Sequence, residues 1–182
     1  MGLDIYAYGR TLCISNGVIH GEPINPKTGE ILDDYDEGAI PYANRHYKKQ
    51  AKGIRSHEYY TYKEMSHFWS TGYGFYNSWR EELAKLAGYE PVPFEQIKGN
   101  PSSITMSYTE GAISKKNGPF IDLIDFSDCE GSIDTQTCRV LLEDFKNFEN
   151  KALLKEDWFK TGYNNWIDGL NIAVNEGFLI FS

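Results

Sequence analysis

The sequence predicts an α+β fold, in which a mixed, mainly antiparallel sheet is packed by about three amphipathic helices. Strand-like alternation opens the chain, helical periodicity dominates its later part, and a short apolar strand closes it. Because strands and helices do not alternate regularly, a doubly wound parallel sheet is not indicated. The 182 residues suit a single globular domain, residues 1–182, with a core of its own.

The first quarter of the chain predicts strands and a long loop. Leu3–Tyr8 alternates apolar and polar side chains, which is typical of a strand with one buried face. The apolar stretch Leu12–His20 is interrupted by Asn16-Gly17, a favoured turn, so we expect a short hairpin there. Gly21–Ile40 is rich in proline, glycine, asparagine and acids, and we expect a surface loop.

The middle of the chain predicts one helix and two strands. Tyr73–Ala87 has apolar residues at helical spacing and is followed by Gly88, a natural helix stop. Residues 89–103 contain three prolines and are expected to form a loop. Ile104–Tyr108 and Phe120–Phe126 are then expected as strands, separated by an Asn-Gly-Pro turn signal.

Two helices and a strand are expected in the last third. The first helix begins near Thr135 with Asp134 as its N-cap, and the second spans roughly Glu156–Glu176. Phe178–Phe181 is wholly apolar and predicts a buried strand. One pattern occurs twice: Tyr, Trp and Leu at positions i, i+3 and i+7 begin at Tyr76 and again at Tyr163. Each set lies on one helix face, which favours two helices with similar core residues.

Composition excludes some classes of protein. The net charge of −8 argues against duplex nucleic-acid binding, which depends on neutralising phosphates. No apolar run approaches a membrane span, and the N-terminus lacks a signal peptide, so we expect a cytoplasmic protein without membrane contact. Three cysteines at irregular spacing favour free thiols, and no motif indicates a cofactor. The oligomeric state stays open.

Basic residues are concentrated in one stretch of this acidic chain. Residues 45–55 contain five cations and no acid: Arg45, Lys48, Lys49, Lys52 and Arg55. Tyrosines lie around them, an arrangement that can hold nucleotides by stacking. The net charge favours another interpretation, in which the stretch is a solvated face or contacts an acidic partner.

Three segments carry a resemblance: MGLDIYAY, FWSTGYGFYNSWREELAKLAG and IDLIDFSDCEGSID. Together they are similar to a group of small uncharacterised proteins from bacteria and their phages. The resemblance implies a bacterial or phage source and implies that the three segments meet in the fold. It brings no catalytic mechanism with it.

The first candidate site is a group of acids after the expected strand Phe120–Phe126, namely Asp125, Asp128, Glu130 and Asp134. Carboxylates gathered at a strand end can bind a hard cation or act as acid and base. The alternative is that Asp128 and Asp134 cap a turn and the following helix.

The second candidate is Ser70-Thr71-Gly72-Tyr73-Gly74, which leads into the first helix. Glycines before a helix expose backbone N–H groups that favour anions, and Arg80 lies two turns further on. The segment lacks the lysine of a P-loop. The alternative is a tight turn, with Arg80 paired to an acid.

The leading functional hypothesis is a non-enzymatic binding protein for a small anionic or nucleotide-like ligand, which in a phage would sequester a host defence signal. Its pocket would lie between the first helix and the acids and would use Tyr73, Tyr76, Arg80, Asp128, Glu130 and Trp166. A metal-assisted phosphoester hydrolase, with Asp125, Asp128 and Glu130 as candidate ligands, is one alternative. The other is an acidic protein-interaction module or inhibitor that uses Asp33, Asp34, Asp36 or Glu37.

Overall fold

The computed structural model describes residues 2–15, 18–19, 22–25, 27–32, 38–126 and 130–182. Within them the largest sheet has four strands in the order β10–β11–β1–β7, and every neighbouring pair is antiparallel. The strands are β1 (Gly2–Gly9), β7 (Glu64–Gly72), β10 (Gly131–Asp134) and β11 (Phe178–Phe181). The predicted α+β fold class is confirmed, as are the first and last predicted strands.

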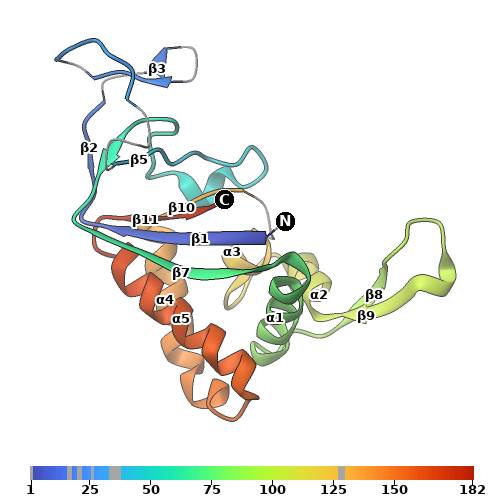
Figure 1. The fold of residues 1–182 in the computed structure, drawn as a ribbon. Coiled ribbons are helices and arrows are strands. Elements are labelled where there is room, and N and C mark those ends of the chain that lie inside the picture. The colour runs from blue at the N-terminus through green and yellow to red at the C-terminus, as the bar shows by residue number, and fades with distance from the viewer. Residues whose placement is uncertain (1, 16–17, 20–21, 26, 33–37, 127–129) are drawn as a thin grey trace.

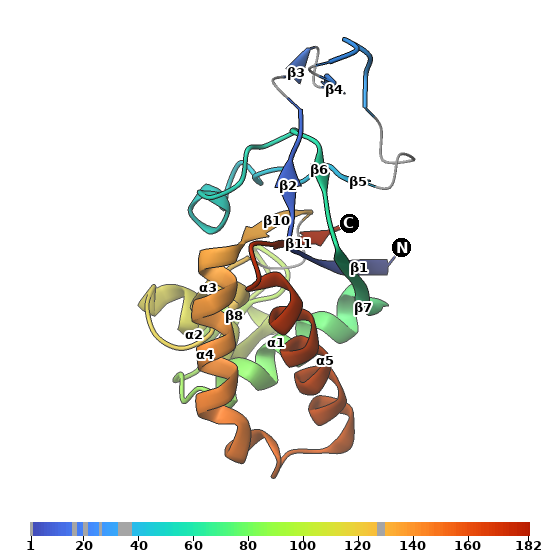
Figure 2. The ribbon, with the colours of Figure 1, turned by 90° about the vertical axis from the view of Figure 1, so that its left-hand side faces the viewer.

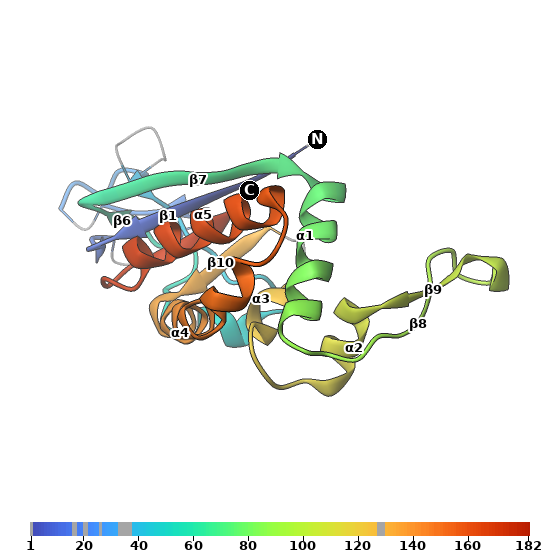
Figure 3. The ribbon, with the colours of Figure 1, turned by 90° about the horizontal axis from the view of Figure 1, so that it is seen from below.

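Helices cover one face of this sheet (Figures 1 and 3). The three predicted helices are present as α1 (Tyr73–Leu86), α4 (Thr135–Ala152) and α5 (Asp157–Ala173). Two short helices, α2 (Tyr108–Lys115) and α3 (Ile121–Ile124), lie beside α1. Alternate residues of β1 are buried, so this strand faces the helical layer as its sequence predicts.

Smaller elements lie above the other face of the sheet (Figures 1 and 2). They are a sheet of β2 (Leu12–Cys13), β6 (Tyr60–Thr61) and β5 (Gly38–Ala39), the 3-10 helix η1 (Lys48–Ala51), and the pair β3 (Val18–Ile19) and β4 (Glu22–Pro23). The hairpin expected within Leu12–His20 is wrong, because β2 pairs with β6 and β3 pairs with β4. Its proposed turn, Asn16-Gly17, lies outside the described residues.

A two-stranded hairpin projects from the body of the molecule (Figures 1 and 3). It consists of β8 (Val92–Glu95) and β9 (Ile104–Ser107), with the 3-10 helix η2 (Pro101–Ser103) at its tip. We call residues 92–107 the arm. The prediction of loop for residues 89–103 is therefore wrong at β8, where Pro93 is tolerated because the ribbon has only two strands and proline can occupy an edge position.

The expected strand Phe120–Phe126 is also wrong, since its centre forms α3. Its polar residues, Asp122 and Asp125, are three positions apart, which fits a helical turn better than the two-residue period of a strand. The apolar residues Leu123 and Ile124 are fully buried against the core. The candidate acids therefore follow a helix, and Ser70–Gly72 belongs to the end of β7 rather than to a glycine-rich loop.

The repeated Tyr-Trp-Leu pattern forms the centre of the core. Tyr76, Trp79 and Leu83 of α1 are fully buried, as are the corresponding residues of α5, Tyr163, Trp166 and Leu170. The rings of Trp79 and Trp166 stack, with centroids 5.9 Å apart and planes 13° apart. The two helices thus use their similar faces against each other.

A β-bulge in β7 turns two consecutive aromatic residues toward α5. The pairing shifts between Ile5, opposite Trp69, and Tyr6, opposite His67, so Phe68 is the extra residue. Glycines on α5 make room for both rings. A Cβ on Gly169 would lie 2.5 Å from the ring of Phe68, and a Cβ on Gly162 would lie 2.4 Å from that of Trp69.

Gly162→Ala should therefore destabilise the protein by about 1–3 kcal/mol, the usual cost of overpacking a core. The control is Gly74→Ala on α1, where an added Cβ meets nothing within 4 Å. That change should stabilise by about 0.5–1 kcal/mol through helix propensity. Urea unfolding of both variants measures the difference. Equal effects of the two changes would contradict the close α5–β7 packing.

Candidate functional site

A cavity lies between α1, the start of α2 and the inner face of the arm. We call it the arm cleft. Its volume is about 550 Å³, within the roughly 300–1,000 Å³ typical of small-molecule sites. The side chains that line it include Arg80 and Glu81 of α1, Phe94 and Met106 of the arm, and Glu110 of α2.

The guanidinium of Arg80 is buried, with only 6 % of the residue exposed. Its Nη1 donates to the carbonyl oxygen of Ile124 at 2.6 Å, and its Nη2 donates to Oδ1 of Asn77 at 2.7 Å. The guanidinium also lies 5.4 Å from the centre of the Tyr76 ring, and Nε makes no hydrogen bond to any residue that the structure describes. Every one of these partners is electrically neutral.

A buried cation normally has a carboxylate partner, because desolvation of an isolated charge is costly. Among the described residues, no ion pair involves Arg80. The sequence also allowed an alternative in which Arg80 pairs with an acid. No such pair is present among the described residues. At the wall of the arm cleft, the positive charge of Arg80 therefore has no ion-pair partner among the residues that the structure describes.

Glu81, the neighbouring acid, serves a structural purpose at the start of α2. Its carboxylate accepts hydrogen bonds from the backbone N–H groups of Tyr108 and Thr109 at 2.6 and 3.0 Å and from the hydroxyl of Ser107 at 3.0 Å. Burial alone would raise the pKa of Glu81, but these hydrogen bonds outweigh burial and hold the pKa below its ordinary value. The carboxylate therefore compensates the α2 N-terminus rather than Arg80.

Two of the aromatic residues predicted to contact a ligand lie in the core. Tyr76 and Trp166 are both fully buried, so neither reaches a molecule that arrives from solvent. Tyr73 is half-buried and packs against the same core. Of the five predicted ligand-binding residues that the structure describes, Arg80 lines the arm cleft and the other four are not among its lining residues.

The predicted acids Asp125 and Glu130 contact a different part of the molecule. Asp125 and Asp122 both pair with Lys49 of η1, with N–O distances of 3.7 and 3.2 Å. Glu130 accepts a hydrogen bond from the Tyr42 hydroxyl at 3.1 Å. Burial and this carboxylate raise the pKa of Tyr42 to about 12, so the phenol keeps its proton and donates. Lys49 of the basic stretch 45–55 thus pairs with acids of its own chain.

The metal-assisted hydrolase hypothesis needs Asp125, Asp128 and Glu130 to lie close together. Asp128 lies outside the described residues, as do Asp33, Asp34, Asp36 and Glu37 of the proposed acidic interaction surface. In the part of the chain that the structure describes, no group of three or more histidine, cysteine, aspartate or glutamate side chains is arranged to hold a metal ion. Asp125 and Glu130, the two candidate ligands that the structure describes, contact Lys49 and Tyr42 respectively.

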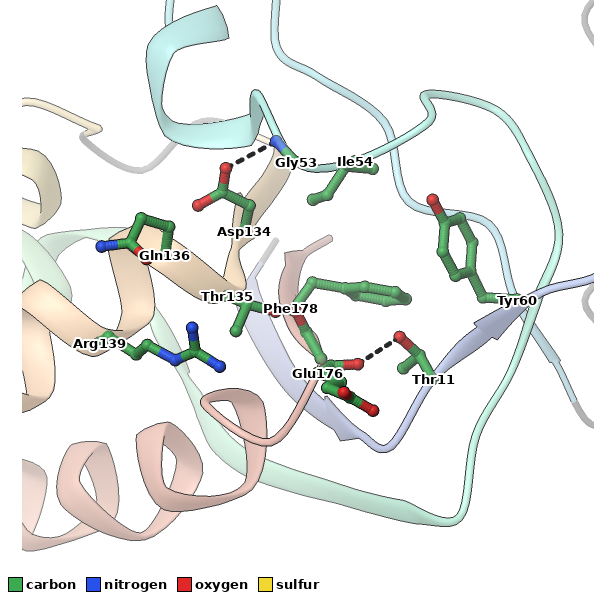
Figure 4. Close-up of a pocket in the computed structure, with 11 residues that line it drawn as sticks. Thr11, Gly53, Ile54, Tyr60, Asp134, Thr135, Gln136, Arg139, Glu176 and Phe178 are labelled. Atoms are coloured by element: carbon green, nitrogen blue, oxygen red, sulfur yellow. Dashed lines mark hydrogen bonds between the residues drawn. The ribbon is translucent and has the colours of Figure 1, made fainter.

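Figure 4 shows a smaller cavity, of about 250 Å³, at the start of α4. Phe178 forms part of its floor, and Asp134 lies at its edge. The prediction that Asp134 is an N-cap is confirmed, since its carboxylate accepts from the N–H of Thr137 at 2.8 Å. The same carboxylate accepts from the N–H of Gly53, also at 2.8 Å.

The remaining charges around this cavity are balanced. Arg139 and Glu176 are both exposed and carry opposite charges, and Arg139 donates to the carbonyl oxygen of Val174 at 3.3 Å. Because the helix start is already capped and the charges offset each other, this cavity has a weaker reason than the arm cleft to hold an ion.

Most of the arm cleft, apart from Arg80, is not predicted by the sequence. The signal for its arm was an apolar alternation, Val92 and Phe94 before the turn and Ile104 and Met106 after it. The neighbouring prolines obscured this pattern. The sequence does not predict α2, and so it does not predict that Glu81 accepts hydrogen bonds at the start of that helix.

In comparisons with known proteins, no family model matches the chain, and no curated protein or solved structure matches it. The resemblance to bacterial and phage proteins therefore stays a prediction. None of the described helices has the length and apolar character needed to cross a membrane. Any function must be argued from the chemistry of the sites themselves.

Glu81→Gln should lower the free energy of unfolding by about 1 kcal/mol near neutral pH, because a charged acceptor at the start of α2 is lost. A group whose pKa is lowered by folding stabilises the protein above its unfolded pKa and loses this effect as the pH falls through the folded value. The gap between wild type and variant should therefore close in acid.

Urea unfolding of wild type and variant at two pH values, one near neutral and one well below the ordinary pKa of glutamate, measures this difference in the free energy of unfolding. Glu95→Gln is the control, since Glu95 is exposed on the arm. A gap that is the same at both pH values would show that the charge of Glu81 is unimportant.

Proposed function

We propose that this protein binds a small anionic ligand in the arm cleft and does so without chemical turnover. The observation that carries the proposal is the guanidinium of Arg80, which is buried at the wall of the cleft and has only neutral partners among the described residues. An anion in the cleft would supply a countercharge that the described residues do not.

The electrostatic effect of Arg80 is large enough to matter. At an effective dielectric constant of about 20, two opposite charges about 5 Å apart attract by about 3 kcal/mol. Dehydration of the anion reduces that gain, but hydroxyl and amide groups of the lining replace part of its hydration. Asn77, Gln96 and Thr109 are placed to do so.

The rest of the lining indicates the shape of the ligand. Phe94 and Met106 add apolar surface, so the ligand should have a flat or apolar body beside its charged group. Glu110 also lines the cleft and opposes a high negative charge. A ligand with one anionic group on an aromatic or sugar-like body, such as a nucleoside monophosphate, fits these constraints and the cleft volume.

Binding without turnover would act by lowering the free concentration of such a ligand. A sequestering protein needs affinity and abundance but no general base or nucleophile. In a bacterial or phage setting, the ligand would be a soluble signal of the host cell.

Thermal unfolding with AMP, cyclic AMP and inorganic phosphate tests the proposal, with uncharged adenosine as the ligand control. A ligand at about 100 times its Kd should stabilise the protein by about 2.7 kcal/mol, which corresponds to a rise in Tm of roughly 5–10 °C for a chain of this size. At least one anion should raise Tm, and Arg80→Met should abolish the rise.

Two further variants separate binding from folding. Phe94→Ser changes an exposed side chain of the cleft and should weaken ligand binding while the fold is kept, even if Arg80→Met destabilises α1. Arg139→Met removes the cation of the Figure 4 cavity and should leave the rise in Tm unchanged. No response of the wild type to any anion, or an equal response of the Arg80 variant, would overturn the proposal.

A further inference from the structure

The arm exposes large apolar side chains while standing away from the core (Figures 1 and 3). The exposed fractions are 40 % for Phe94, 62 % for Ile97, 52 % for Ile104 and 57 % for Met106. Single exposed apolar residues are common, but a group of them on one projecting element indicates a surface that another molecule covers.

The tip of the arm is held in shape by its own hydrogen bonds. The hydroxyl of Ser103 accepts from the N–H of Ile97 at 2.9 Å and donates to the carbonyl oxygen of Asn100 at 2.8 Å. The side chain of Asn100 in turn accepts from the N–H of Ser102 at 3.1 Å. A preorganised tip loses little conformational entropy when it binds, which favours association.

The two faces of the arm have different surroundings. Phe94 and Thr105 are paired across the strands and line the arm cleft. The neighbouring pairs, Glu95 with Ile104 and Pro93 with Met106, point to the opposite side, because alternate residues of a strand face opposite ways. We call Pro93, Glu95 and Ile104, together with Ile97 at the tip, the outer face; Met106 lines the arm cleft and is not counted with it.

Charge around the outer face decides which molecule can cover it. The arm and the residues that lead into it, 89–107, contain two acids, Glu90 and Glu95, and one base, Lys98. A second copy of this chain carries a net charge of −8 and is disfavoured by repulsion, as is a surface of anionic lipid. The complementary surface has apolar residues surrounded by lysine or arginine.

We propose that the outer face of the arm is a docking surface for a partner protein that presents apolar side chains within a basic patch. Ile97 and Ile104 supply the apolar contact, and Glu90 and Glu95 pair with cations at its rim. This interaction uses the side of the arm that faces away from the ligand cleft, so it does not depend on the function proposed for that cleft.

A labelled peptide of alternating leucine and lysine is the probe, and a peptide of alternating leucine and glutamate is its matched control. Fluorescence anisotropy with the full chain should show binding of the lysine peptide and none of the glutamate peptide. Ile97→Ser combined with Ile104→Ser should weaken binding roughly tenfold or more, because two apolar contacts are lost. Glu90→Lys combined with Glu95→Lys should weaken it as well, and added salt should do the same.

The matched control variant is Leu153→Ser combined with Leu154→Ser. These leucines are 59 % and 88 % exposed at the turn between α4 and α5, away from the arm in Figure 1. This variant should bind the lysine peptide within about twofold of wild type, and both serine variants should keep the anion-dependent rise in Tm.

Three results would overturn the docking proposal. One is equal loss of peptide binding in the arm variant and the Leu153/Leu154 variant, which would indicate general attraction to an acidic protein. Another is a dimer, seen by light scattering, that the arm variant abolishes. The third is arm-dependent binding to phosphatidylcholine vesicles, since lipid would then be the occupant.

Discussion

The packing of α5 against β7 is the constraint on which the arrangement of this molecule depends. Gly162 and Gly169 allow the helix to approach the strand, and the β-bulge directs Phe68 and Trp69 into the space so created. Trp79 then stacks on Trp166, which places α1 beside α5. The position of α1 in turn brings Arg80 to the carbonyl oxygen of Ile124 and to the wall of the arm cleft.

The parts of the fold that could be predicted are those set by local periodicity. The i, i+3, i+7 pattern from Tyr76 and from Tyr163 predicts two helices with buried faces, and both are present. The acid before Thr135 predicts an N-cap, and Asp134 provides it. Each of these signals depends on residues within one or two turns of the chain.

The parts that were missed depend on distant contacts. β7 was not predicted because the bulge places Phe68 and Trp69 on the same side and so breaks the two-residue alternation. Arg80 was recognised as a candidate, but its burial against α3 and its neutral partners follow from tertiary packing. Tyr76 and Trp166 were assigned to a pocket, although their spacing equally fits the core, where the structure places them.

Three of the four tryptophans lie within a single cluster. The ring centroids of Trp69, Trp79 and Trp166 are 5.1–6.3 Å apart, and all three residues are almost completely buried. At such separations the indole rings exchange excitation energy, so these three tryptophans emit as a unit, beside the separate emission of Trp158. Their fluorescence depends on the contact between α1, α5 and β7. A change in it therefore indicates that these three elements have separated.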